Sequence, residues 1–396
     1  MRTTFLTVSF ALIGVSVAFP TGTGTNAAGC PFAGTHSQAK RQTSAPFDPV
    51  KQRIDVSGEH AFRPPGPNDK RGPCVGLNAL ANHGYISRDG VTTITEAISA
   101  SNKVFGLGKN SVTVFSTQAA LHGGDIASGI YSIGGPEPAP GLGGTHHQIE
   151  GDASPTRNDA YVNNGDASTM NLDYFKHLYD LVPEGESANF DMSVMAKHRA
   201  WTRQNSISTN PHYFTAPYAG LFVSTLTHML TPALLSNHSA EHPDGILGHN
   251  VLKSFYSVTG DANSLTYQPG HEVRLLVFLK TGIGARVTMT LLSSLAFDKL
   301  VLEHPEFFSV GGNTGKPNTF TGVNVEDLTG GIFNAKNLLE GKNLICFALQ
   351  ASQAGMTAPA SELFSKTIAP MISSLGCPMM KQYNTSALEV YPGHRG

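Results

Sequence analysis

The chain has 396 residues with a formal net charge of −2 at pH 7, and only 14% of its residues are charged. Soluble proteins average about 25% charged residues, so the composition offers neither a basic surface for nucleic acid nor an acidic tail for a basic partner. The length allows one large domain or two ordinary ones. The 42 glycines and 24 prolines predict many long loops.

The first residues have the features of a secretory signal. Arg2 precedes an apolar stretch from Phe5 to Val17, and Ser16-Val17-Ala18 fits the small-residue pattern of a cleavage site. The stretch is too short to span a bilayer comfortably. We therefore expect a signal peptide over 1–18 and a secreted protein.

A propeptide is expected over 19–41. The segment is rich in Ser, Thr and Gly and ends in the dibasic pair Lys40-Arg41. The remaining domain is then 42–396. A second strongly apolar region, 273–302, is interrupted by charged residues, so we expect no membrane-spanning helix and no membrane partner.

Helical patterns dominate the domain. Strand-like alternation is scarce and no internal repeat is visible. Apolar residues recur at helical spacing in these segments: 75–83, 95–105, 112–121, 172–181, 192–205, 247–258 and 360–375. Pro370 should kink or break the last one. We predict a mostly α-helical, single compact multi-helix domain with long loops.

Cys74 follows Pro73 and stands at the start of the first of these helices. A thiol there faces unpaired backbone N–H groups and the positive end of the helix dipole, and both favour the thiolate. Such a thiolate can be a nucleophile, a metal ligand or the axial ligand of a haem iron.

Three pairings are possible for the four cysteines, Cys30, Cys74, Cys346 and Cys377. Cleavage after Arg41 would remove Cys30, and Cys346 and Cys377 could then form a bridge that leaves Cys74 free. The alternative is that Cys30 stays and pairs with one of the others. Asn237-His238-Ser239 and Asn384-Thr385-Ser386 are acceptor motifs for N-glycosylation, which fit a secreted protein.

A second cluster of polar residues is Glu150-Gly151-Asp152-Ala153-Ser154. Glu150 and Ser154 lie four residues apart, which would place them on one face of a helical turn. A carboxylate, a hydroxyl and a backbone oxygen at Gly151 suit a hard cation such as magnesium. The alternative is an acidic helix N-cap without a metal.

The two clusters together resemble the secreted haem-thiolate peroxidases, the chloroperoxidase and unspecific peroxygenase family. The resemblance is carried by Arg71-Gly72-Pro73-Cys74, Gly76-Leu77-Asn78, Leu80-Ala81-Asn82-His83-Gly84, Glu150-Gly151-Asp152-Ala153-Ser154 and Thr156-Arg157. It extends to Thr209-Asn210-Pro211, Phe214-Thr215-Ala216, His304-Pro305-Glu306-Phe307 and Val310-Gly311-Gly312-Asn313-Thr314-Gly315.

Membership of that family would imply a mostly helical fold around haem b, with Cys74 as the axial ligand of the iron. Glu150, Gly151 and Ser154 would hold a magnesium ion beside a haem propionate. A disulfide near the C-terminus of longer members matches Cys346 and Cys377. The implied activity is the hydrogen-peroxide-dependent oxidation or oxygenation of a small organic substrate, an oxidoreductase reaction.

The chain departs from the family pattern at two places. Val75 stands where proline usually follows the cysteine, and we hypothesise that the Val75 N–H donates to the sulfur. Ala219 stands where the longer peroxygenases carry a catalytic glutamate. Peroxide cleavage needs an acid–base group, and His212 is the candidate because its ordinary pKa of about 6.5 suits that role. Glu241 and Asp244 are other possible sources.

Three rival functions follow from the same residues. A secreted haem-binding protein with little turnover would explain the missing glutamate. A haloperoxidase-like tailoring enzyme of secondary metabolism would use the same haem on one dedicated substrate. His238-Ser239-Ala240-Glu241-His242 fits a zinc peptidase pattern, which requires a helix that presents both histidines.

Overall fold

The computed structural model describes residues 47–273, 300 and 303–395, except 137, 139, 355 and 357. The expected signal peptide (1–18), the expected propeptide (19–41) and Cys30 lie outside the described residues, as does most of the apolar region 273–302. Residues 44–396 form one compact unit. The predicted mostly α-helical domain with long loops is confirmed.

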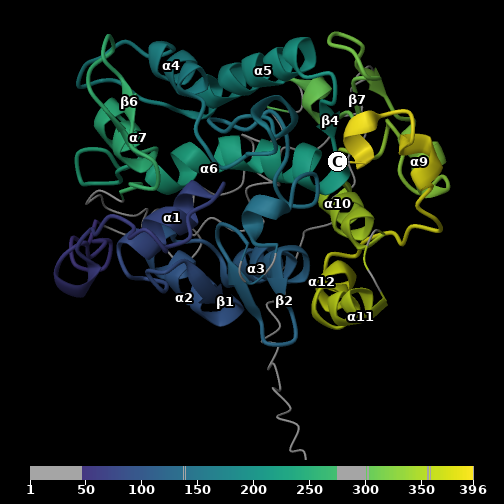
Figure 1. The fold of residues 1–396 in the computed structure, drawn as a ribbon, viewed down its shortest axis with the longest axis horizontal. Helices are drawn as coiled ribbons and strands as arrows, with labels where there is room; N and C mark the ends of the chain where they lie inside the picture. Colours follow the sequence, from purple (N-terminus) through teal and green to yellow (C-terminus); the bar gives the residue numbers. More distant parts are fainter. Residues whose placement is uncertain are drawn as a thin grey trace, which may run out of the picture. The chain divides into compact units, whose positions relative to one another are not determined.

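The described helices are α1 Val75–Asn82, α2 Ile94–Phe105, α3 Lys109–Gly123, α4 Leu172–Asp180, α5 Met192–Thr209, α6 Thr225–Leu235, α7 His249–Phe255, α9 Val325–Thr329, α10 Asn343–Gln353, α11 Ala358–Thr367 and α12 Ala369–Ser374. Each segment predicted as helical contains a helix (Figure 1), whereas α6, α9 and α10 were not predicted. The segment predicted as one helix over 360–375 is divided between α11 and α12, with Pro370 in the first turn of α12. Proline is tolerated there because its missing N–H has no helical partner at that position.

The described strands are only two or three residues long, and their pairing connects loop segments to one another. Strands β1 (Val91–Thr93), β3 (Ile130–Ser132) and β2 (Gly124–Asp125) form an antiparallel sheet in that spatial order. Strands β4 (Phe214–Thr215), β7 (Gly311–Gly312) and β8 (Thr321–Gly322) form a second antiparallel sheet, and β5 (Val258–Thr259) pairs with β6 (Thr266–Tyr267).

Local capping fixes where α2 begins and ends. The side chain of Thr93 accepts a hydrogen bond from the N–H of Glu96 at 3.1 Å, which satisfies an otherwise unpaired donor of the first turn. Gly106 ends the helix in the left-handed conformation, at φ 65°, which glycine adopts without steric cost. The buried face of α2 includes Ala97, Val104 and Phe105.

A long apolar helical stretch runs through the middle of the domain in Figure 1. It begins with a π-helix, η4 (Pro217–Ser224), and continues directly as α6. Pro217–Leu235 is long and apolar enough to cross a membrane by length and composition, but 78% of its most apolar window is buried inside the protein. Such burial is that of a core helix, and it places one face of α6 next to the cavity described below.

The C-terminal part packs on this central stretch. Helix α10 contacts η4, and a disulfide joins Cys346 of α10 to Cys377, which follows α12. The structure therefore contains the bridge that the resemblance implied. Buried apolar residues of η4, α6, α10, α11 and α12 form one cluster of the core, with Phe222, Leu349 and Phe364 among them.

Candidate active site

A cavity of about 280 Å³ lies among α1, α2, α3 and α6. Its walls are mostly apolar and include aromatic side chains from the α2–α3 region and leucines from α6. The lining side chains that argue for an apolar ligand are Leu80, Phe105, Leu107, Phe115, Leu230 and Leu234. Apolar walls with a few polar groups are typical of a site for a cofactor or an organic molecule.

Cys74 reaches this cavity from the start of α1. It is the N-cap residue of the helix, as predicted, and its thiol is free. The thiol is accessible from within the cavity, yet protein surrounds it, and this burial raises the pKa of the Cys74 thiol. A neutral thiol is therefore the preferred state until a cation binds it.

The backbone N–H groups of Leu77 and Gly76 oppose the effect of burial and lower the pKa of Cys74, although no N–H of the first turn caps its side chain with a hydrogen bond. The N–H of Val75 does not donate to the sulfur in this structure either, contrary to the sequence-based hypothesis. At a helix start, the N–H groups two and three residues after the N-cap point back toward its side chain, whereas the first does not.

Arg157 and Glu272 form a buried ion pair behind Cys74. Their Nη2 and Oε1 atoms lie 3.1 Å apart, and their side chains are 3% and 0% exposed. The Nε of Arg157 donates to the carbonyl oxygen of Pro73 at 3.3 Å, and Arg157 also lines the cavity. Sequence reasoning missed Glu272, because its partner is 115 residues away and no local pattern marks it.

Glu150, Gly151 and Ser154 line the same cavity as Cys74. The structure thus brings together the two clusters that the sequence singled out. Glu150 Oε1 is buried without a hydrogen-bond partner among the described residues, while Oε2 lies 2.5 Å from Nδ1 of His146. An unpartnered carboxylate oxygen is of the ligand type that magnesium prefers.

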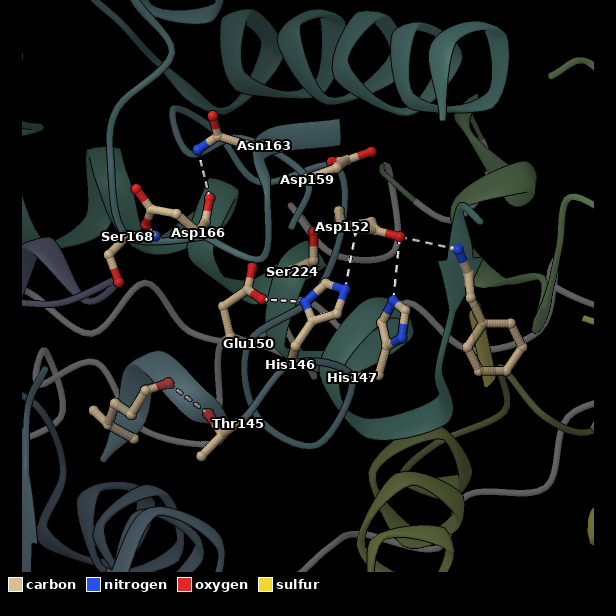
Figure 2. Close-up of polar contacts among 12 residues, drawn as sticks. Thr145, His146, His147, Glu150, Asp152, Asp159, Asn163, Asp166, Ser168 and Ser224 are labelled. Carbon is tan, nitrogen blue, oxygen red and sulfur yellow. Dashed lines mark hydrogen bonds and ion pairs between the residues drawn. The ribbon is translucent and has the colours of Figure 1, made fainter. Parts of the chain in front are cut away.

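Figure 2 shows the polar cluster that adjoins Glu150. His146, His147 and Asp152 offer ligand atoms that all lie within 4.8 Å of one another. Asp152 Oδ2 accepts from the N–H of Phe214 at 3.0 Å and lies 3.1 Å from Nε2 of His147. The spacing of the two adjacent histidines gave no sign of this arrangement, because His147 reaches it in a left-handed turn at φ 59°.

The ionisable groups of this cluster differ in their pKa values. Burial disfavours the charged form of His146, but its hydrogen bond to Glu150 and the charge of Asp152 outweigh it and raise the pKa of His146 to about 9. Burial and the neighbouring His146 lower the pKa of His147 to about 3. Burial raises the pKa of Asp152 to about 6. The positive charge of the cluster at neutral pH therefore sits on His146.

His212 is not among the residues that line the cavity. Its ring stacks on the exposed Tyr161 with the ring centroids 3.7 Å apart, and its backbone N–H donates to Asn210. Ala219 is fully buried and is not a lining residue either. Glu241 and Asp244 are exposed. Among the described residues that line the cavity, Glu150 is the only carboxylate.

The remaining sequence motifs have these places. Residues 238–242 are not helical, so they do not present both histidines as the zinc peptidase pattern requires. Both glycosylation motifs are on loops or short turns: Asn237 forms an isolated bridge with Ile246, and Asn384 precedes a 3₁₀ turn. Both asparagines are partly exposed.

Comparison with known proteins finds peroxidases and peroxygenases. The family model described as Peroxidase, family 2 matches residues 60–268. The chain is 35% identical over 387 residues to the dothistromin biosynthesis peroxidase dotB of Dothistroma septosporum, covering 91% of each chain. It is 35% identical over 367 residues to the aromatic peroxidase fscJ of Fusarium equiseti, covering 85% of this chain and 82% of that one. An aromatic peroxygenase of Cyclocybe aegerita is 30% identical over 287 residues, 70% of each chain.

Proposed function

The chain belongs to the family 2 peroxidases, haem-thiolate oxidoreductases that use hydrogen peroxide to oxidise or oxygenate organic molecules, and on this basis we propose that Cys74 is the thiolate ligand of its haem b. The observation that carries the assignment is the free thiol at the start of α1, which opens into an apolar cavity. An axial thiolate donates electron density that favours cleavage of the O–O bond of a peroxide.

The protein around such a haem would supply binding, orientation and electrostatics. The Leu77 and Gly76 N–H groups at the start of α1 would stabilise the thiolate form of Cys74. The apolar side chains of α2, α3 and α6 exclude water from the cavity. Exclusion of water strengthens every electrostatic interaction inside it.

Glu150, Gly151 and Ser154 are proposed to hold a structural magnesium ion. The support is the unpartnered Oε1 atom of Glu150 and the common position of the three residues on the cavity wall. The ion would offset the negative charge of a haem propionate and fix the loop that carries Glu150.

Proton transfer to and from peroxide requires a group that reaches the cavity. His212 does not meet this condition, because its ring lies against Tyr161 and away from the lining residues. With Glu150 assigned to the metal, the hydroxyl groups of Ser224, Thr227 and Thr231 are among the lining groups left to relay a proton.

A dedicated substrate is a second, more specific proposal. The dotB relative is named for dothistromin biosynthesis and shares 91% of its length with this chain, which favours a tailoring enzyme of secondary metabolism. The aromatic side chains of the cavity, Phe105, Phe115 and Phe255, suit an aromatic or otherwise apolar molecule. Secretion and glycosylation at Asn237 and Asn384 remain proposals from the sequence.

The test is an absorption spectrum of the purified protein. A strongly red-shifted Soret band after reduction under carbon monoxide is expected for the wild type and is lost in Cys74→Ser. Peroxide-dependent turnover of an aromatic substrate separates an enzyme from a haem-binding protein with little turnover. An unchanged spectrum in Cys74→Ser, or a disulfide on Cys74 in the mature protein, contradicts the assignment.

A further inference from the structure

We propose that Arg157 and Glu272 are positioning residues that tune the Cys74 thiolate in opposite directions, so that Arg157 raises and Glu272 lowers the reduction potential of the bound iron. This inference rests on the proposed haem ligation by Cys74. Neither charged side chain takes part in the proposed binding of haem or magnesium.

Arg157 contacts the residue that precedes Cys74. Its guanidinium donates through Nε to the carbonyl oxygen of Pro73, the residue before Cys74, at 3.3 Å. Its Nη1 donates to the hydroxyl of Tyr267 at 3.3 Å. The side chain is 3% exposed, so its charge acts on the neighbouring sulfur with little screening by solvent.

Glu272 opposes that charge from the other side of the pair. Its Oε1 accepts from Arg157 Nη2 at 3.1 Å and from Asn78 Nδ2 at 3.0 Å. Asn78 belongs to α1, the helix that Cys74 caps, so the carboxylate is tied to the same element as the thiol. Its Oε2 is buried without a partner among the described residues.

Both charges act on the same sulfur. Arg157 contacts the carbonyl of Pro73, which precedes the sulfur-bearing residue, and Glu272 contacts Asn78 in the first turns of the helix that follows it. A cation that favours the thiolate also favours added electron density on the iron–sulfur unit. One-electron reduction of ferric to ferrous haem adds one negative charge there, so Arg157 should assist the reduction and Glu272 should oppose it.

A purely structural ion pair would behave differently. Breaking a buried pair from either side leaves one unpaired charge and destabilises the fold in both cases. Such damage would loosen the loop at Pro73 in the same way for both variants. Opposite shifts of potential are therefore the signature that separates tuning from support.

The experiment compares the holoprotein with Arg157→Gln, Glu272→Gln and the double variant by spectroelectrochemical titration, with dithionite as the reductant. We expect a more negative potential in Arg157→Gln, a more positive one in Glu272→Gln and a value between them in the double variant. Arg157→Lys, which keeps the charge, should return most of the potential lost in Arg157→Gln.

Two controls isolate the effect of charge. Tyr267→Phe removes a hydrogen-bond partner of Arg157 without changing any charge, and its potential should stay at the wild-type value. Lys176→Gln removes a cation from an exposed pair with Asp180 and should do the same. If Arg157→Gln does not fold, the comparison of the double variant with Glu272→Gln gives the sign for Arg157, and the comparison of Glu272→Gln with the wild type gives the sign for Glu272.

The outcomes are distinct. Shifts of the same sign in the two single variants, or no shift in either, overturn the inference while the wild-type spectrum still supports haem ligation by Cys74. A wild type without the red-shifted Soret band under carbon monoxide contradicts the proposed function itself. The same band should persist in Glu272→Gln, because the thiolate remains in place.

Discussion

Asn78 holds the backbone of Gly72 with two hydrogen bonds: its side-chain oxygen accepts from the Gly72 N–H and its side-chain nitrogen donates to the Gly72 carbonyl, both at 3.0 Å. The pair ties the loop that precedes Cys74 to α1 from within. The same side-chain nitrogen also donates to Glu272. One amide therefore connects the loop, the helix and the buried ion pair.

Replacing the Asn78 amide should destabilise the fold around Cys74. Asn78→Ala leaves the backbone groups of Gly72 without their partners in a buried environment, and we expect it to lower the free energy of unfolding by about 2 to 4 kcal/mol. Asn102→Ala, which removes one partly buried bond to the Leu107 carbonyl, should cost about 1 kcal/mol. Urea denaturation of both variants tests this difference. Equal losses of unfolding free energy would show that the two hydrogen bonds to Gly72 stabilise the protein no more than a single partly buried bond does.

Stability should fall between neutral and alkaline pH because of His146. Its pKa in the folded protein is about 9, above the ordinary 6.5, so the folded state holds this proton more tightly than the unfolded state. The stabilisation is fully present below about pH 6.5 and is lost as the pH rises through 9.

The size of that effect has an upper bound. The difference in pKa corresponds to about 3 kcal/mol, and the side chain is 19% exposed, which reduces it. In chelator-treated protein, the unfolding free energy should decline from pH 6.5 to 9 in the wild type, and His146→Gln should flatten this decline. His304→Gln, at a pair outside the cluster, is the matched control. A wild-type slope in His146→Gln would assign the decline to another group.

Metal content should depend on Glu150. Glu150→Gln replaces a carboxylate oxygen that faces the cavity with a neutral amide, which is a poorer ligand for a hard cation. Elemental analysis should find less magnesium per chain, while iron remains bound through Cys74. Glu306→Gln, at an exposed glutamate, should keep the wild-type content. Equal magnesium in both variants would place the ion elsewhere.

The disulfide should contribute to stability without affecting the haem ligand. The bridge between Cys346 and Cys377 closes a loop of 31 residues, for which chain entropy predicts about 3 to 4 kcal/mol. The double variant Cys346→Ala, Cys377→Ala should lose about that much in guanidinium denaturation and keep the red-shifted band under carbon monoxide. A loss of the band would mean that α10 positions the cavity as well as stabilising the fold.

Local patterns in the sequence were enough to predict the element that carries Cys74. Proline, cysteine and the apolar repeat of α1 are neighbours along the chain, so helix spacing and capping preferences describe them fully. The resemblance then related Cys74 to Glu150, Gly151 and Ser154, and the structure places all four on one cavity.

Long-range contacts could not be predicted in the same way. Glu272 meets Arg157 where Asn82 of α1 donates to the carbonyls of Gly270 and Glu272, and nothing near residue 272 marks it as a partner. His212 shows that residue type alone does not place a side chain. Its residue type suited an acid–base role, but the packing of its ring on Tyr161 decides its position, and residue type carries no information on that.

The contact of Gly151 with η4 restricts how this site can change over evolutionary time. A Cβ atom at position 151 would lie 3.1 Å from the carbonyl carbon of Ala219, so the loop and the π-helix touch backbone to backbone. A lineage that gains a side chain at 151 must displace the backbone at position 219. The close approach therefore constrains position 151 to glycine, while the side chain at position 219 can change without affecting this contact.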